Sequence, residues 1–170
     1  NVIVCPHPRS VRQWGEIDLG RHGRVGLSLS RVLNADQSLY DALSHSAAVV
    51  GLNTSAQIEA GILGKPVLSL LAPGFEKGQQ GTLHFRYLLR EEGGFVELAS
   101  DLDEHKTHLA RAVSGGYDVD EIRRAVERFI RPEGWQQPAT PILADAITDM
   151  AGERPSRVRR WLHSATRAGR

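Results

Sequence analysis

The sequence has one cysteine, few aromatic residues and no long apolar run, and each shortage excludes a class of protein. One cysteine in 170 residues cannot form an internal disulfide, which excludes a small disulfide-stabilised scaffold and favours the reducing cytoplasm. No apolar stretch approaches the ~18 residues of a membrane-spanning helix. With 41% hydrophobic and 24% charged residues, the chain has the composition of a folded domain and not of a disordered segment.

The formal net charge of +1 conceals two oppositely charged parts. Residues 151–170 hold six arginines and one acid, a net charge of +5, whereas residues 1–150 hold 15 basic and 19 acidic side chains, a net charge of −4. We therefore divide the chain into a domain, residues 1–150, and a basic C-terminal tail, residues 151–170. The tail is either a segment that touches an anionic membrane at its inner face or a solvated terminus. The acidic domain and the 6% of aromatic residues argue against a nucleic-acid partner.

Short apolar segments alternate with segments of helical periodicity along the domain. The apolar segments are nearly continuous, which is typical of parallel strands covered on both faces. We therefore predict an α/β fold with a doubly wound parallel sheet and extra C-terminal helices. The expected strands are 1–5, 25–29, 47–52, 66–71 and 95–98, and the expected helices start near residues 38, 54, 101, 118 and 140, with a short helix inside the loop 74–94.

Three of these elements carry more specific expectations. Thr54 and Gln57 have the capping-box spacing of a helix start, and Gly64 stands where a left-handed residue ends that helix. Residues 1–5 are predicted to form a buried strand that includes Cys5. The last helix is predicted to bury an apolar stripe, which consists of Ile142, Leu143, Ala146, Ile147 and Met150.

The turn after the third predicted strand is the best candidate for a binding site. Ligands of doubly wound sheets bind beyond the carboxyl ends of the strands, and Gly51, Asn53, Thr54 and Ser55 occupy this turn at the start of a helix. Free backbone N–H groups and the helix dipole there attract an anion such as phosphate. Glu59 shares a helix face with Ser55, where its carboxylate could accept hydrogen bonds from a pair of sugar hydroxyls. The alternative is that Thr54 only caps the helix and that Glu59 is solvated.

Two histidines are further candidates. His7 lies between two prolines at the end of the first predicted strand, where an imidazole can donate to a phosphate or carry a proton. His84 lies in the loop that follows the fourth predicted strand, on the side of the sheet where a site is expected. For His7 and for His84, a purely structural role is the alternative. The Gly-rich nucleotide fingerprints and the G-x-S-x-G motif are absent. His105 and His108 lack a third spaced ligand, so we predict no metal.

Two motifs resemble a known group of bacterial enzymes. Residues 1–8, a strand followed by His-Pro, and residues 46–67, a small-residue turn with Glu-Ala and Gly-Lys-Pro-Val, look like elements of the capsule-polysaccharide transferases and CDP-glycerol glycerophosphotransferases. The second motif also resembles the UDP-N-acetylglucosamine 2-epimerases. The resemblance covers roughly residues 1–113. One departure is Cys5, which stands where the family usually has a basic residue.

The resemblance implies that the chain is the C-terminal, Rossmann-like half of a GT-B glycosyltransferase for surface or capsular polysaccharide. It implies that His7 contacts the donor phosphate and assists catalysis, that Thr54 and Ser55 bind the phosphate, and that Glu59 binds the ribose hydroxyls. The donor would be a nucleotide sugar or a CDP-activated group, with no metal or other cofactor. The acceptor-binding N-terminal half would be a separate partner segment, so we expect the chain alone to be inactive. A sugar-nucleotide 2-epimerase-like domain and a non-catalytic α/β interaction domain are the alternatives.

Overall fold

The computed structural model describes residues 1–28 and 35–151. The chain forms two compact units, one of residues 1–130 and one that begins at Arg131. The predicted boundary after residue 150 stays a prediction. The basic tail, apart from Ala151, lies outside the described residues, and so does its predicted contact with a membrane.

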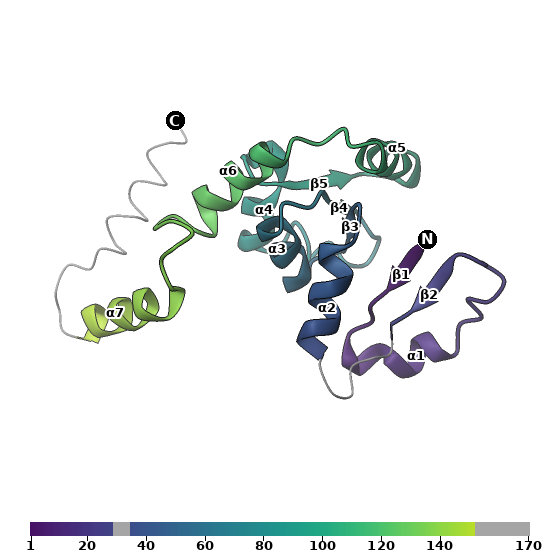
Figure 1. Ribbon diagram of the computed structural model, residues 1–170, viewed down its shortest axis with the longest axis horizontal. Helices are drawn as coiled ribbons and strands as arrows, with labels where there is room; N and C mark the ends of the chain where they lie inside the picture. Colours follow the sequence, from purple (N-terminus) through teal and green to yellow (C-terminus); the bar gives the residue numbers. More distant parts are fainter. Residues whose placement is uncertain (29–34, 152–170) are drawn as a thin grey trace. The chain divides into compact units, whose positions relative to one another are not determined.

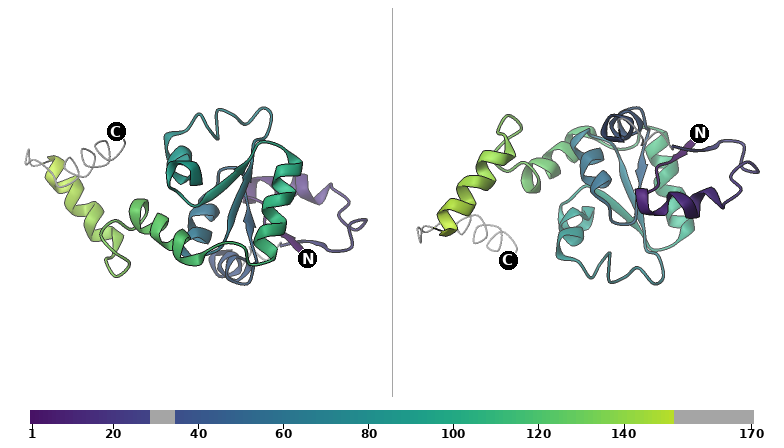
Figure 2. Two further views of the ribbon diagram at one scale, coloured as in Figure 1. Left: turned by 90° about the horizontal axis from the view of Figure 1, so that it is seen from above. Right: turned by 90° about the horizontal axis from the view of Figure 1, so that it is seen from below.

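A three-stranded parallel sheet forms the centre of the first unit (Figure 1). Its order is β3-β4-β5, so each connection crosses over to the neighbouring strand through a helix. Helix α3 follows β3 and helix α5 follows β5, and the two lie on opposite faces of the sheet (Figure 2). The elements are β3 (Val49–Val50), α3 (Ser55–Ile62), β4 (Val67–Leu70), α4 (Leu83–Leu88), η2 (Arg90–Glu92), β5 (Val96–Ala99), α5 (Leu102–Val113) and α6 (Val119–Phe129).

The remaining described elements of the first unit include a second, two-stranded parallel sheet. Its strands β1 and β2 pair from Val2 with Val25 to Val4 with Leu27. The parallel strands and the alternating helices confirm the predicted α/β, Rossmann-like class, although the hydrogen-bonded strands make two sheets. The elements are β1 (Val2–Val4), η1 (Pro8–Ser10), α1 (Val11–Gly15), β2 (Val25–Leu27) and α2 (Ala35–Ser44).

Strand β4 lies at the centre of the core. It has a hydrogen-bonded strand on each side, and helices cover both faces, so Val67, Leu68 and Ser69 are all buried. Helix α6 contributes Ile122 and Val126 to the core, as its 3.6-residue periodicity predicts. The turn that follows β3 is bonded to this core, because the Gly51 N–H donates to the carbonyl of the buried Leu68 at 3.1 Å.

The expectation of a buried first strand is wrong. The side chains of Val2 and Ile3 are exposed, at 56% and 61%, and Cys5 is exposed as well. The physical reason is that β1 pairs only with β2 among the described residues, and a two-stranded sheet leaves most of its surface open. An apolar β-branched run thus predicts the strand but not its burial.

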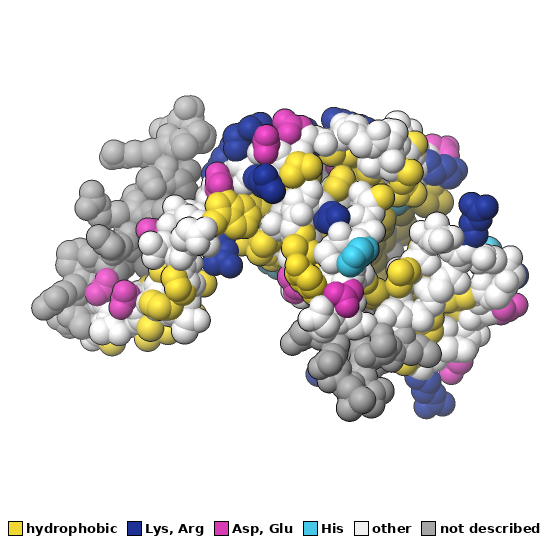
Figure 3. Space-filling model, viewed as in Figure 1, with side chains coloured by type: hydrophobic (Ala, Val, Ile, Leu, Met, Phe, Trp, Pro, Cys, Tyr) yellow, Lys and Arg dark blue, Asp and Glu magenta, His cyan; other side chains and the backbone are white. Residues whose placement is uncertain are grey.

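The predicted buried stripe on the last helix is also wrong. Helix α7 (Ala139–Ala151) belongs to the second unit and has no buried residue. Leu143 and Met150 are 63% and 74% exposed, and apolar side chains appear on the surface of this unit (Figure 3). The periodicity identifies the apolar side of the helix, but no described element of the second unit covers that side.

Replacing Gly61 by alanine is expected to destabilise the first unit. A Cβ at Gly61 would lie 2.3 Å from the ring of Phe95, so helix α3 or the ring must move. Overpacking of this kind costs about 1–3 kcal/mol of unfolding free energy, which urea denaturation measures. Gly15→Ala is the control, because its Cβ would meet nothing within 4 Å. Equal stability of the two variants would contradict the close packing of α3 on Phe95.

Candidate functional site

The turn between β3 and α3 is held from inside the protein by Gln57. Its Oε1 accepts a hydrogen bond from the Thr54 backbone N–H at 3.0 Å, and its Nε2 donates to the Gly51 carbonyl at 3.1 Å. The first of these is the glutamine half of the predicted capping box. Gln57 has no exposed surface, so it spans the turn on the side that faces the protein interior. The helix start therefore lies directly after the carboxyl end of β3.

Three of the predicted site residues face solvent around this helix start. Thr54, Ser55 and Glu59 are exposed, and the first turn of α3 contains no acidic residue. The positive end of the helix dipole and the first N–H groups are thus not neutralised by a carboxylate of the helix's own first turn. The predicted arrangement of a hydroxyl and a carboxylate on one helix face remains available to a ligand.

Asn53 connects the turn to the segment that follows β4. Its Nδ2 donates to the Gly78 carbonyl oxygen at 2.5 Å and lies 3.3 Å from Thr82 Oγ1 and 3.2 Å from His84 Nε2. An amide nitrogen carries two hydrogens, so it donates to at most two of these three atoms at once. His84 is exposed. The structure therefore brings together two predicted site residues, Asn53 and His84, that are 31 positions apart.

A buried polar network beneath the turn was not predicted from the sequence. Gln79 Nε2 donates to the carbonyl oxygens of Leu52 and Leu70, at 2.9 and 3.0 Å, and Ser69 Oγ donates to the same Leu52 oxygen at 3.3 Å. Gln79 and Ser69 are both buried. The only sequence signal was one serine inside the otherwise apolar strand β4. A glutamine in a glycine-rich loop has no pattern that would distinguish it from a solvated one.

His7 is not brought to this turn by any hydrogen bond of the described residues. It follows β1 in the two-stranded sheet, and its Nδ1 accepts a hydrogen bond from the Arg9 backbone N–H at 3.2 Å. Its ring thereby caps the short helix η1. This contact gives His7 a structural role, with a backbone N–H as its partner, and the role of His7 at a phosphate stays a prediction.

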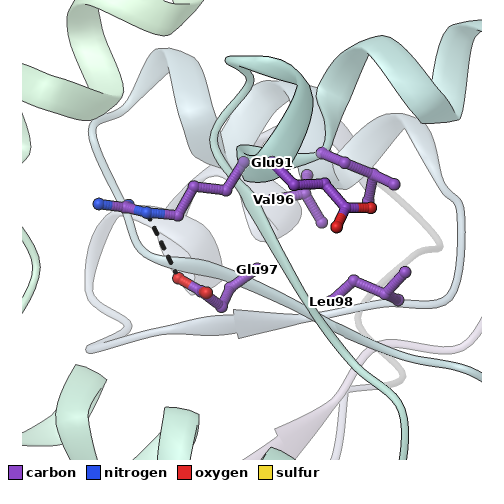
Figure 4. Close-up of a pocket in the computed structure, with 6 residues that line it drawn as sticks. Glu91, Val96, Glu97 and Leu98 are labelled. Atoms are coloured by element: carbon purple, nitrogen blue, oxygen red, sulfur yellow. Dashed lines mark ion pairs between the residues drawn. The ribbon is translucent and has the colours of Figure 1, made fainter.

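A second group of polar residues lies beside β5. Glu97 Oε2 is 3.7 Å from Arg90 Nε, and Arg90 also pairs with Glu121 of α6 at 2.5 Å. The dashed line at Glu97 in Figure 4 marks its ion pair with Arg90, at a small pocket of about 60 Å³. Its lining residues are Leu89, Arg90, Glu91, Val96, Glu97 and Leu98. Because Arg90 is already paired with two carboxylates, this group links β5 to α6 and is separate from the predicted site.

Tyr117 and two histidines complete this second group. The guanidinium of Arg111 lies 4.3 Å from the centre of the Tyr117 ring, and burial, followed by the negative charge of Glu97, raises the pKa of Tyr117 to about 12. Burial likewise lowers the pKa of His105, and His108 adds to that shift. His108 Nε2 lies 4.0 Å from Glu97 Oε1. The described residues contain no group of three or more His, Cys, Asp or Glu side chains arranged to hold a metal ion.

The raised pKa of Tyr117 predicts a loss of stability at high pH. Between the ordinary tyrosine pKa of about 10 and about 12, the unfolded chain releases this proton while the folded chain keeps it. The unfolded state then binds fewer protons, so the free energy of unfolding falls as the pH rises. Tyr117→Phe should remove part of that fall in urea denaturation at pH values on either side of 10. Tyr40→Phe, at an exposed position, should leave it unchanged, and an unchanged slope in Tyr117→Phe would contradict the assignment.

Comparisons with known proteins leave the site to be interpreted from its geometry. A scan against protein-family models and searches of curated proteins and of solved structures found no match to this chain. Among the described residues, no helix has the length and apolar character needed to cross a membrane.

Proposed function

We propose that this chain is the donor-nucleotide-binding domain of a glycosyltransferase or glycerophosphotransferase that makes bacterial surface polysaccharide. The observation that carries the proposal is the meeting of Asn53 and His84, 3.2 Å apart, beside the start of α3. Two segments that follow neighbouring parallel strands thus place an amide and an imidazole next to an exposed helix N-terminus. This is the edge at which α/β sheets bind nucleotides, and it includes the turn of the second of the two motifs on which the family resemblance rests.

The chemistry of this edge suits a nucleoside diphosphate. The first N–H groups of α3 and the Ser55 hydroxyl can donate to phosphate oxygens, and the helix dipole favours their negative charge. Glu59, one turn further along, is a carboxylate that can accept hydrogen bonds from two ribose hydroxyls. In a transferase, donors at the diphosphate would stabilise the charge that develops on the leaving group.

The remaining parts of the proposal follow the family resemblance. His7 would add a donor to the phosphate, and an acceptor-binding half would supply the general base. The proposal places the domain in the cytoplasm, where nucleotide-activated donors are used, with the basic tail at the inner face of the membrane. The 2-epimerase-like alternative has the same nucleotide site and differs in the reaction, so analysis of the product distinguishes the two.

The proposal is tested by adding nucleotides to the whole chain and measuring its melting temperature. A ligand that binds only the folded state adds about 2.7 kcal/mol at 100 times its Kd, which raises the melting temperature of a chain of this size by about 5–10 °C. We expect this rise with UDP or CDP and no comparable rise with inorganic phosphate. If neither nucleotide changes the melting temperature, the nucleotide-binding proposal fails. The non-catalytic interaction domain, which the exposed apolar side of α7 favours, would then be preferred.

A further inference from the structure

The side chain of Gln79 is fully bonded inside the protein. Its Nε2 donates to the carbonyl oxygens of Leu52 and Leu70, at 2.9 and 3.0 Å, and lies 3.5 Å from Ser69 Oγ. Its Oε1 accepts from the Ala72 backbone N–H at 3.2 Å. Only 1% of the residue is exposed. The amide orientation is fixed by these partners, because carbonyl oxygens need a donor and the N–H group needs an acceptor.

These three partners belong to the segments that build the proposed binding edge. Leu52 opens the turn that leads into α3, Leu70 is the last residue of β4, and Ala72 begins the loop that leads to α4. Backbone groups at strand ends no longer have a sheet partner, and they cost free energy when they are buried without another. Gln79 supplies that partner to all three segments at once.

The turn also donates a hydrogen bond back to the loop. Asn53, the residue after Leu52, donates to the carbonyl of Gly78, the residue before Gln79. Thr82 Oγ1 donates to the carbonyl of Gln79 itself at 2.9 Å and lies 3.3 Å from Asn53 Nδ2. A displacement of Gln79 would therefore move the Asn53 side chain and the backbone that leads into α3.

We propose that Gln79 is the positioning residue of this binding edge: it holds the turn at Leu52–Ser55 and the loop at Ala72–Thr82 in the arrangement that receives a nucleoside diphosphate. Gln79 is buried and acts through the backbone of the turn, whereas Ser55 and Glu59 would touch the ligand. The identity of the ligand rests on the proposed function. The positioning role rests on the hydrogen bonds of Gln79 and Asn53.

The test compares Gln79→Met with Ser69→Ala in the whole chain. Methionine keeps the length of glutamine and removes both donors and the acceptor. Ser69→Ala removes a buried hydrogen bond to the same Leu52 oxygen and the long contact, at 3.5 Å, between Ser69 Oγ and Gln79 Nε2. It leaves the shorter bonds of Gln79 to Leu52, Leu70 and Ala72 in place. Both variants lower the melting temperature, so stability alone does not separate positioning from packing. UDP and CDP titrations by calorimetry, at a temperature where both variants are folded, provide one readout, and the backbone amide resonances of residues 53–57 and 72–82 provide the other.

We expect Gln79→Met to weaken nucleotide binding by about tenfold or more, which corresponds to the loss of one well-placed hydrogen bond to a charged group. Its amide resonances should shift in both segments. Ser69→Ala should bind within about threefold of the original chain, because the short bonds of Gln79 to the turn and the loop remain. Its resonances in 72–82 should stay in place. Nucleotide affinity in Gln79→Met equal to that of the original chain, or equal losses in the two variants, would overturn the inference.

Two further outcomes are decisive as well. If Gln79→Met does not fold, Gln79→Asn replaces it, since the shorter side chain cannot reach both carbonyl oxygens, and the same two readouts apply. If the original chain binds neither nucleotide, the proposed function fails. The amide resonances then decide the positioning role alone, because Gln79→Met must still shift those of residues 53–57.

Discussion

Replacing Glu59 by alanine is expected to weaken the binding of UDP or CDP by about 10–100-fold. Hydrogen bonds to a charged group contribute about 1.5–3 kcal/mol each, and one such bond to a ribose hydroxyl accounts for the lower end of that range. Glu59 is exposed on the same face of α3 as Ser55, so its removal leaves no cavity. Calorimetric titration measures the affinity, and the melting temperature without nucleotide should stay close to that of the original chain.

Two companion variants locate the effect. Ser55→Ala should reduce affinity by a smaller factor, because a neutral donor to phosphate is lost while the N–H groups of the helix remain. Glu92→Ala removes an exposed carboxylate from η2 and should leave binding unchanged. If Glu59→Ala and Ser55→Ala both bind nucleotide as the original chain does, the site does not lie at this helix start.

Replacing Gln57 by alanine is expected to destabilise the first unit by about 2–4 kcal/mol. The variant removes the hydrogen bonds of Gln57 to the Thr54 N–H and the Gly51 carbonyl, and each such bond contributes about 0.5–1.5 kcal/mol. It also opens a cavity where a fully buried side chain stood. Urea denaturation monitored by circular dichroism measures the loss.

Gln80→Ala is the matched control, because Gln80 is exposed and surface substitutions usually change stability by less than about 0.5 kcal/mol. Gln57→Glu adds a second comparison, since it keeps the acceptor for Thr54 and loses the donor to Gly51. We expect its stability to fall below that of the original chain. Similar unfolding curves for Gln57→Ala and Gln80→Ala would show that the turn is held by other contacts.

Local structure could be predicted where neighbouring residues decide it. Gln57 caps the helix that its spacing from Thr54 predicts, and Gly64 adopts the left-handed conformation, with φ at +70°, that its place before Pro66 indicates. The short helix α4 inside the long loop and the strand β5 also match the prediction. These features depend on contacts within a few residues, so the printed sequence contains the information they need.

Burial could not be predicted in the same way. The run at residues 1–5 forms a strand, yet Val2 and Ile3 are exposed, and the apolar stripe of α7 is exposed as well. Conversely, Gln57 and Gln79 are polar and buried. Periodicity identified the apolar side of both α6 and α7, but only that of α6 is covered. Whether an apolar side is covered depends on which distant element packs against it, and periodicity does not contain that information.

The candidate site also combines features that neighbouring residues decide with features that depend on distant contacts. The sequence by itself determined the α/β class, the turn at Gly51–Ser55 and the start of α3, because alternation of apolar segments and capping chemistry are local properties. Only the tertiary structure decided that Asn53 meets His84 and that Gln79 joins both loops from below, because these contacts span 31 and 27 positions. The parallel order of β3 and β4 brings their carboxyl ends to one edge, and hydrogen bonds between the segments that follow them form only there.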